Sequence, residues 1–388
     1  MKVNVTWSTE DNAQVAGKMC AKKAVLDLIQ TKIAILYNST KYDSNNLLEG
    51  AKSVLGSAPI IGCTASKGII TQDGFVSSNK GFAGMMAIGD QDTEVSTAIS
   101  EKKGTARQTG RNVAIKAKQK MDTDWAPAYY MIITTPGEEE EYLKGVQDII
   151  GDVPCFGGVA SDEDLSGKWN VYTEEAIVQN GVAVAFFYTN KHMKNILEGK
   201  FHETIHSGVI TKVTDKRVID EINGVPALKQ YAEWTDNKVR DIKGVKLLEK
   251  SALKPIGIKD LNGDFQLIKQ LLNGNTDYSI NISNNVSVNM CAIQMQISKD
   301  EIVNSTAVIL RELKNENSEA ILINHSLSRF NAIANSQDLV DKMIKKLKKE
   351  ADGKPFLVAF TNGEFGKGKN SPNSCGNLMV SETIFANN

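Results

Sequence analysis

Two stretches of the sequence, PIIGCTAS at residues 59–66 and PCFGGVAS at residues 154–161, share the pattern Pro-x-x-Gly-x-x-Ala-Ser. The two copies lie 154 − 59 = 95 residues apart. In each copy a short apolar run meets a glycine, which predicts a buried strand that ends in a sharp turn. The pattern therefore predicts that one structural element occurs twice in this chain.

The surroundings of the two copies also match. An apolar run and then a segment with helical spacing precede each copy, and a Gly-bearing loop and a second apolar run follow it. The upstream runs are IAILY (33–37) and YYMIITTPG (129–137); the downstream runs are FAGMMAIG (82–89) and GVAVAFFY (181–188). This order predicts an internal duplication of a strand–helix–strand–strand unit.

The same order occurs a third time near the C-terminus. Apolar runs at 320–326, 355–360 and 377–385 predict strands, residues 336–350 predict a helix, and TNGEFGKG (361–368) predicts a turn. Further helices are expected at 13–30 and 98–121, and a different kind of region at 205–315. We therefore expect an α/β fold of mixed sheets with flanking helices, in two domains that divide near 189–205, where the strand pattern is lost.

The composition excludes several classes of protein. The chain has 388 residues, of which 41% are hydrophobic, and 45 Lys and Arg balance 46 Asp and Glu. This balance does not favour nucleic-acid binding, and no apolar run approaches the roughly 18–20 residues that span a membrane. The N-terminus has no apolar core of a signal peptide, and the five cysteines form no CxxC pair. We expect a cytoplasmic protein without membrane insertion or a zinc cage.

The strand-end turns are the first candidate site. Gly62, Cys63 and Thr64 form the turn of the first copy, and Phe156, Gly157 and Gly158 occupy the equivalent place in the second. The two sets either form tight structural turns or offer backbone N–H groups to a ligand at the strand ends, where α/β sheets bind ligands. Cys63 is also a possible nucleophile, but no histidine lies near it in sequence, and a buried cysteine usually packs as a small hydrophobe.

Charged residues near two later strand ends are the second candidate. Arg329 could fork a carboxylate and Glu364 could accept an ammonium group, so together they could recognise a zwitterion such as an amino acid. Alternatively, both side chains are solvated or pair with each other.

The histidines favour a structural interpretation. His202 and His206 are four residues apart, but the flanking sequence is strand-like and supplies no third ligand. His325 ends an apolar strand close to Arg329 and could be packed there. The sequence also lacks the phosphate-loop, GxGxxG, GxSxG and HExxH motifs.

Taken in order, these motifs resemble the FIST sensory domains. The Gly-Cys-Thr turn, the Phe-Gly-Gly turn followed by Ala160-Ser161-Asp162, and GVAVAFFY resemble the N-terminal half of FIST. The turn at Asn223–Ala227, HSLSR (325–329) and AFTNGEFG (359–366) resemble the C-terminal half. Ser326 stands where that half usually has a cysteine and Ala359 where it has a glycine, whereas Arg329, Gly363 and Glu364 are kept.

The resemblance implies a domain division and a set of site residues. It implies a helical lead-in at 1–30, an N-terminal FIST domain at 31–195 and a C-terminal FIST domain at 196–388. The implied ligand-binding residues, including those proposed above, are Gly62, Cys63, Thr64, Phe156, Gly157, Gly158, Ser161, Asp162, Arg329, Gly363 and Glu364.

The function implied by the resemblance is sensory and non-catalytic. We expect a small ligand, such as an amino acid or a similar metabolite, and a signal that passes to a separate protein such as a kinase or chemoreceptor. Haem is the competing cofactor, because some relatives are described as haem-dependent sensors of nitric oxide, and it requires an axial ligand such as histidine. An enzyme that uses Cys63 as nucleophile is the third hypothesis.

Overall fold

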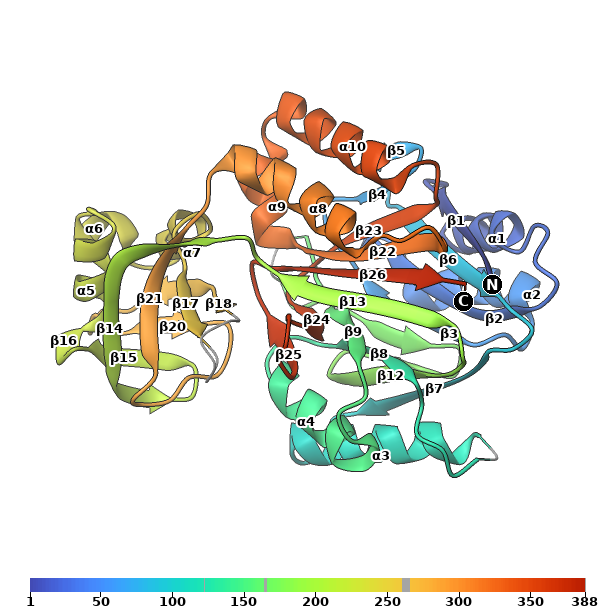
Figure 1. Cartoon of the computed structure of the whole chain (residues 1–388), viewed down its shortest axis with the longest axis horizontal. Helices are drawn as coiled ribbons and strands as arrows, with labels where there is room; N and C mark the ends of the chain where they lie inside the picture. The colour runs from blue at the N-terminus through green and yellow to red at the C-terminus, as the bar shows by residue number, and fades with distance from the viewer. Residues whose placement is uncertain (122, 164–165, 260–265, 388) are drawn as a thin grey trace.

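The computed structural model describes residues 1–121, 123–163, 166–259 and 266–387, and has a body of three similar units with one inserted domain (Figure 1). Each unit follows the order strand, helix, strand, helix, strand, hairpin, strand. The first unit contains β1 (Lys2–Ser8), α1 (Ala13–Ala24), β2 (Thr31–Asn38), α2 (Ser44–Leu55), β3 (Ile60–Thr64), β4 (Ile69–Thr71), β5 (Gly74–Val76) and β6 (Ala83–Gly89).

The second and third units repeat this order. The second contains β7 (Glu94–Glu101), α3 (Ala106–Gln119), β8 (Tyr129–Thr134), α4 (Glu139–Ile150), β9 (Cys155–Val159), β10 (Val171–Thr173), β11 (Ile177–Val178) and β12 (Gly181–Tyr188). The third adds a short helix, α9, and contains β13 (His192–Glu198), α8 (Lys299–Leu313), β22 (Ser318–Ser326), α9 (Leu327–Ala334), α10 (Gln337–Ala351), β23 (Phe356–Thr361), β24 (Glu364–Lys367), β25 (Asn373–Gly376) and β26 (Val380–Ala386).

The three units exchange their hairpins in a cycle. Each unit forms a sheet of four strands, and the hairpin of another unit extends that sheet at its third strand. Thus β10 pairs with β3, β24 pairs with β9, and β4 pairs with β23. The exchange makes the body a pseudo-threefold assembly in which every sheet contains strands from two units.

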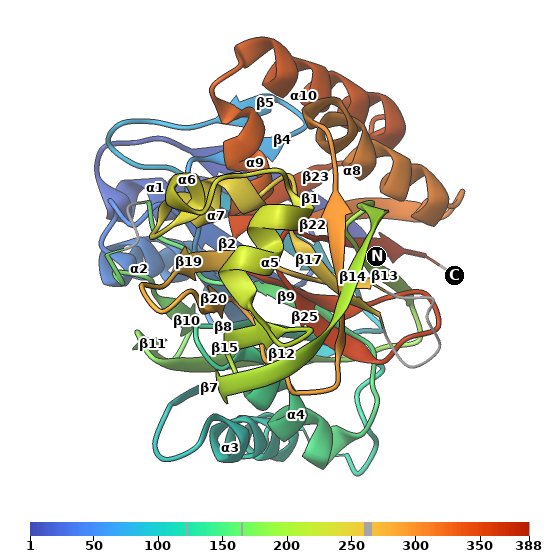
Figure 2. The same cartoon turned by 90° about the vertical axis from the view of Figure 1, so that its left-hand side faces the viewer.

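The inserted domain occupies the connection between β13 and α8. Its strands form one sheet in the order β18-β17-β21-β14-β15-β20-β19, with β16 paired to β15. Its elements are β14 (His202–Asp215), β15 (Val218–Ile222), β16 (Val225–Pro226), α5 (Ala227–Trp234), α6 (Val239–Ile242), α7 (Lys246–Ser251), β17 (Ile256–Lys259), β18 (Gln266–Lys269), β19 (Leu271–Gly274), β20 (Ile280–Ile282) and β21 (Cys291–Gln296). In Figures 1 and 2 this domain lies to one side of the body and packs against its face at α9 and α4.

Pairs of helices cover the outside of the body, and the sheets face one another inside (Figure 1). Side-chain caps fix the helix starts: Asn12, Asp43 and Thr105 each accept a backbone N–H, and Ser298 forms a capping box with Glu301. One central hydrophobic core takes side chains from all three units, whereas the inserted domain has a core of its own. In the described part of the chain, no helix is long and apolar enough to cross a membrane.

The α/β class with mixed sheets and flanking helices is confirmed, but several local predictions are wrong. The segment 98–121 is not one helix, because residues 94–101 form β7 and pair with β12 along its whole length. The segment 189–205 does not lose the strand pattern, since it contains β13. The first 30 residues also contribute β1, which pairs with β6 in the first sheet. The turn predicted at 361–368 contains β24.

Candidate functional site

The repeated motifs meet where the three units join. The Ser161 N–H donates to the Thr64 carbonyl at 3.0 Å, the Asn362 N–H to the Val159 carbonyl at 3.0 Å, and the Ser66 N–H to the Phe360 carbonyl at 3.4 Å. Each bond runs from one unit to another, so the three form a cycle of backbone hydrogen bonds around the pseudo-threefold axis. The Pro-x-x-Gly-x-x-Ala-Ser motif therefore has a structural task at the junction of the units.

The backbone around the first two motifs is already engaged. Gly62 lies in β3 between β2 and β10, and an added methyl group would clash with the Leu36 carbonyl oxygen and approach the Tyr172 ring to 2.5 Å. The Thr64 N–H donates to the Asn170 carbonyl at 3.0 Å. In this structure, therefore, the N–H of Thr64 is not directed toward a ligand. Cys63 is fully buried, and burial raises the pKa of its thiol, which does not favour a nucleophile.

The second motif packs just as closely. Gly157 has φ +138° and approaches the Ile132 carbonyl, while Phe156 and Gly158 lie beside it in the buried strand β9. Gly158 pairs with Glu364 across β9 and β24, and the Gly363 carbonyl accepts the Val159 N–H at 2.8 Å. The structure thus brings the predicted residues at 156–158 and 363–364 together as neighbouring strands.

Ser161 and Asp162 brace the loops at the same junction. The Ser161 hydroxyl donates to the Phe360 carbonyl at 2.8 Å. The Asp162 carboxylate accepts the Gly167 N–H at 2.6 Å and the Lys168 N–H at 3.3 Å. Both side chains are buried and act within the protein in this structure.

Arg329 is fully buried and joins separate segments. Its Nη1 donates to the carbonyls of Gly199 at 2.6 Å and Leu378 at 3.2 Å, and its Nη2 donates to the Ser305 hydroxyl at 2.6 Å. These bonds tie α9 to the end of β13, to α8 and to the segment before β26. Burial lowers the pKa of the guanidinium to about 10, so Arg329 remains charged at neutral pH.

Glu364 is also buried, and it forms no ion pair with Arg329 among the described contacts. Its carboxyl accepts the Met379 N–H at 3.2 Å and the Thr361 hydroxyl at 3.3 Å, and burial raises its pKa well above the usual value. Nearby His325 has its pKa lowered to about 3 by burial and by Arg329, so its ring is neutral at physiological pH. Arg329 and Glu364, which were predicted from the sequence to form a zwitterion site, thus make hydrogen bonds within the protein.

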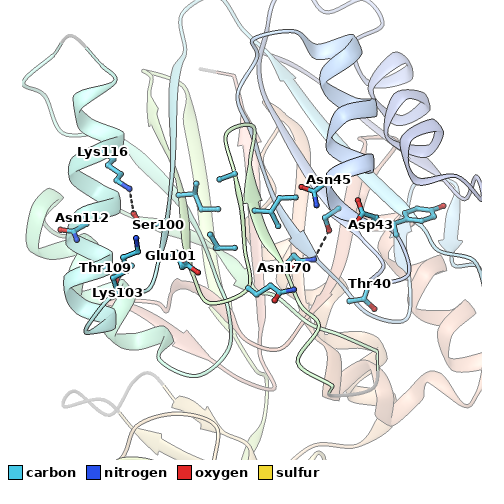
Figure 3. A pocket seen from close by; sticks show the side chains of 17 residues that line it. Thr40, Asp43, Asn45, Ser100, Glu101, Lys103, Thr109, Asn112, Lys116 and Asn170 are labelled. Atoms are coloured by element: carbon cyan, nitrogen blue, oxygen red, sulfur yellow. Dashed lines mark hydrogen bonds between the residues drawn. The ribbon is translucent and has the colours of Figure 1, made fainter.

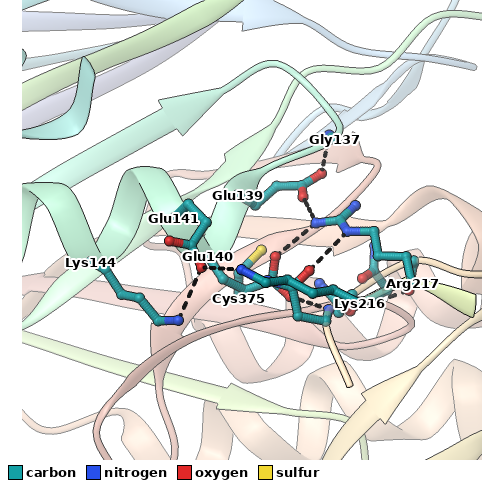
Figure 4. Close-up of polar contacts among 12 residues, drawn as sticks. Gly137, Glu139, Glu140, Glu141, Lys144, Lys216, Arg217 and Cys375 are labelled. Carbon is teal, nitrogen blue, oxygen red and sulfur yellow. Dashed lines mark hydrogen bonds and ion pairs between the residues drawn. The ribbon is translucent and has the colours of Figure 1, made fainter. Parts of the chain in front are cut away.

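The contact between the body and the inserted domain is built on charge (Figure 4). Arg217, in the turn between β14 and β15, pairs with Glu139 at 2.6 Å and Glu140 at 2.7 Å in the first turn of α4. The Asn285 N–H donates to Glu140 at 2.7 Å. Burial raises the pKa of Glu139, whereas Arg217, Lys269 and the Asn285 N–H outweigh burial and lower the pKa of Glu140.

Two buried polar side chains, Lys269 and Asn284, lie close to this contact. Lys269 is almost fully buried, has no ion pair among the described residues, and has a pKa lowered to about 8, chiefly by burial. The Asn284 side-chain amide is buried and its Nδ2 has no hydrogen-bond partner there either. A second contact, from Gln270 Nε2 to the Ser328 hydroxyl at 2.6 Å, links the inserted domain to α9.

A cleft of about 520 Å³ lies beside this second contact, between α7 of the inserted domain and α9 with the start of α8. Leu248 and Leu253 supply apolar surface from the inserted domain, and Ile333 supplies it from the body. Ser328, Asn331, Asn335 and Ser336 add polar groups from the body. The cleft therefore combines apolar surface from both domains with polar groups.

Three charged side chains line the cleft: Glu249, Lys250 and Lys299. None of them has an ion-pair partner among the described residues. None of the three was predicted from the sequence, because α7 and the start of α8 lie within 205–315, which was expected only to be a different kind of region. HSLSR (325–329) is the one sequence motif singled out that contributes to the cleft. Its Ser328 lines the cleft, whereas the neighbouring Arg329 points inward.

The described residues supply neither a cluster of metal ligands nor an apolar pocket for haem beside His206. Among the described residues, no three His, Cys, Asp or Glu side chains are grouped to hold a metal ion. His206 lines a cavity of about 540 Å³, but apart from Ile205 and Trp234 its lining is polar or charged and supplies little apolar wall for a porphyrin. His202 pairs with Glu301 at the surface.

Comparison with solved structures gives only distant similarities. The cyanuric acid hydrolase from A. caulinodans covers 100% of this chain and 99% of its own length, at 7% identity and a TM-score of 0.37. Phosphoribosylformylglycinamidine synthase II from Thermotoga maritima covers 100% of this chain and 73% of its own, at 11% identity and a TM-score of 0.21. No curated protein matches the chain.

Family models match nearly the whole chain. The FIST N domain matches residues 32–225 and the FIST C domain matches residues 227–367, so the models divide the chain about 30 residues later than the sequence prediction at 195–196. FIST domains are sensory, non-catalytic domains implicated in small-ligand binding. The resemblance found in the sequence is thereby confirmed, and the chain belongs to the FIST family.

Proposed function

We propose that this protein is a non-catalytic sensor that binds an amino acid with an apolar side chain in the cleft between α7 and α9. The observation that carries the proposal is the lining of the cleft, where Glu249, Lys250 and Lys299 lie beside apolar surface from both domains and have no ion-pair partner within the described part of the chain. Ligand sites of this type combine an apolar wall with a few polar groups that fix orientation.

The chemistry of the lining matches a zwitterion. Lys299 is the first residue of α8, so a ligand carboxylate there would meet both its ammonium group and the positive end of the helix dipole. Glu249 would accept the ligand ammonium group, and the side chain would pack on Leu248 and Ile333. Arg329 enters the proposal as a positioning residue, because it fixes α9, the wall that carries Ser328 and Asn331.

Binding between two domains supplies a signal. A ligand shifts a conformational equilibrium only by its different affinity for the two states. An amino acid that contacts both α7 and α9 favours the docked arrangement of the inserted domain, and a separate protein such as a kinase or chemoreceptor would read that arrangement. All five cysteines are free, which supports a reducing, cytoplasmic location.

The test is calorimetric titration of the full chain with individual proteinogenic amino acids. We expect leucine, isoleucine, valine or methionine to bind, and Lys250→Ala and Lys299→Ala each to weaken binding about tenfold, because each removes from the lining one positive charge that attracts the ligand carboxylate. Lys246→Ala is the matched control, since Lys246 lies on the same helix but outside the cleft lining.

Two results would overturn the proposal. One is that no amino acid binds the folded wild-type protein. The other is that Lys246→Ala weakens binding as much as Lys250→Ala, which would indicate a general charge effect instead of a site. The melting temperature of each variant, measured alongside, separates a loss of binding from a loss of folding.

A further inference from the structure

The pseudo-threefold body has three corresponding places between neighbouring units. Three segments surround each place. One is the loop that follows the second strand of a unit. The other two belong to the next unit: its hairpin, and its connection from the first strand to the first helix. The loops after β2, β8 and β22 follow the carboxyl ends of parallel strands, where α/β sheets bind ligands.

Two of these places are filled by the chain itself. Between the second and third units, the β13–α8 connection is the inserted domain. Its Arg217 forms ion pairs with the carboxylates of Glu139 and Glu140 (Figure 4). Between the third and first units, Phe75 of the β4–β5 hairpin packs against Phe330 of α9, with ring centroids 5.7 Å apart.

The place between the first and second units is a cavity of about 1020 Å³ (Figure 3). Its walls are the β2–α2 loop, the β7–α3 loop with one side of α3, and the β10–β11 hairpin. Figure 3 shows Asn45 and Asp43 facing Ser100, Lys116 and Asn112 across this space.

The lining is rich in neutral hydrogen-bonding groups. Amide and hydroxyl side chains predominate: Thr40, Ser44, Asn45, Ser100, Thr109, Asn112, Asn170 and Gln179. The charged groups balance, with Asp43 and Glu101 against Lys103 and Lys116. The Asp43 side chain caps α2, and Lys116 donates to the Ser100 hydroxyl at 3.2 Å, so both already have a partner within the protein.

A comparison with the filled place between the second and third units also indicates that the lining of this cavity is neutral where the filled place is charged. Gly50 of α2 and Gly145 of α4 make the same close approach, to the Gln14 and Arg107 carbonyls, and lie 145 − 50 = 95 residues apart. The same offset places Ser44 and Asn45 where the second unit has Glu139 and Glu140. A hydroxyl and an amide therefore replace the two carboxylates that hold the guanidinium of Arg217.

From this lining we propose that the cavity between α2 and α3 binds a neutral polyhydroxylated molecule of the saccharide class. Amide and hydroxyl side chains both donate and accept hydrogen bonds, as sugar hydroxyls require, and the balanced charge offers no preference for an anion or a cation. This site is separate from the cleft between α7 and α9, so its failure leaves the amino-acid proposal untouched.

The test is saturation-transfer NMR on the full chain with D-glucose, N-acetyl-D-glucosamine and maltotriose, each at millimolar concentration. We expect saturation transfer to at least one of them, and its loss in Ala176→Trp, which fills the cavity from an exposed hairpin position without removing a polar group. Asn45→Glu should also abolish it, by introducing the charge found in the second unit. Lys118→Ala, on α3 but outside the lining, is the matched control and should leave transfer unchanged.

The outcomes distinguish a free sugar from a saccharide chain as the ligand. Transfer to the monosaccharides indicates a free sugar, and transfer to maltotriose alone indicates a chain. No transfer to any of the three, transfer that survives Ala176→Trp in the folded variant, or competition by inorganic phosphate would overturn the proposal. The melting temperature of each variant confirms that it is folded.

Discussion

At the scale of single residues, Gly62 decides between the two interpretations of the strand-end turns. Its backbone is paired on both sides, and its missing side chain lets β2 and the Tyr172 ring approach. We expect Gly62→Ala to lower the free energy of unfolding by about 3 kcal/mol, because the neighbouring backbone cannot give way. Chemical denaturation measures this change.

Gly104 is the matched control for Gly62. It has φ +80° but nothing within 4 Å of an added methyl group, so Gly104→Ala should cost only about 1 kcal/mol of backbone strain. If Gly62→Ala kept its stability and instead lost binding of the cognate ligand, Gly62 would belong to a ligand cradle, and its structural role would be refuted.

At the scale of elements, the docking of the inserted domain depends on one arginine held by two carboxylates of α4. Removing Arg217 leaves Glu139 and Glu140 side by side in a mostly buried place. We expect Arg217→Ala to destabilise the docked domain by about 2–3 kcal/mol, less than the roughly 3–5 kcal/mol of a fully buried pair, since 24% of the Arg217 side chain is exposed. Hydrogen exchange of the Asn285 amide, which bonds Glu140, reports the undocking.

The defect of Arg217→Ala should depend on pH. Burial raises the pKa of Glu139, whereas Arg217 helps to lower the pKa of Glu140, so the loss of Arg217 raises both carboxyl pKa values relative to the wild type. As the pH falls through these raised values the carboxyls become neutral and their repulsion disappears, so the defect shrinks from pH 8 toward pH 5. Lys216→Ala, the neighbouring exposed lysine 3.8 Å from Glu141, should change stability by less than about 0.5 kcal/mol at either pH. A defect that is the same at both pH values would exclude this electrostatic origin.

The sequence predicts elements well where proline, glycine and apolar runs mark them, and poorly where neighbouring patterns merge. PIIGCTAS and PCFGGVAS identified β3 and β9 because packing requires the same glycine in both. β7 was missed because its strand pattern runs into the Ala- and Lys-rich α3, and β13 because an edge strand alternates with exposed polar residues. The cleft could not be predicted, since Glu249 and Lys299 are ordinary surface charges until docking brings their elements together.

At the scale of the whole molecule, the cyclic exchange of hairpins links the three units more tightly than chain order suggests. Each sheet is completed by a hairpin from another unit, and the backbone bonds from Ser66, Ser161 and Asn362 close the cycle. One unit therefore cannot open without removing a hairpin from a neighbouring sheet. The inserted domain, in contrast, has its own core, and its covalent links to the body are the two chain segments next to β13 and α8.

This difference predicts two levels of opening in native-state hydrogen exchange. We expect the slowest amides of β2, β8 and β22 to share one opening free energy, because those strands lie in sheets that can open only together. The slowest amides of β15 and β20 should exchange at a lower free energy, and Arg217→Ala should lower that value without moving the first. Three distinct free energies for β2, β8 and β22 would mean that the units unfold separately. The hairpin exchange would then not couple the three units. The body would also not be a single rigid support for the docking of the inserted domain when a ligand binds.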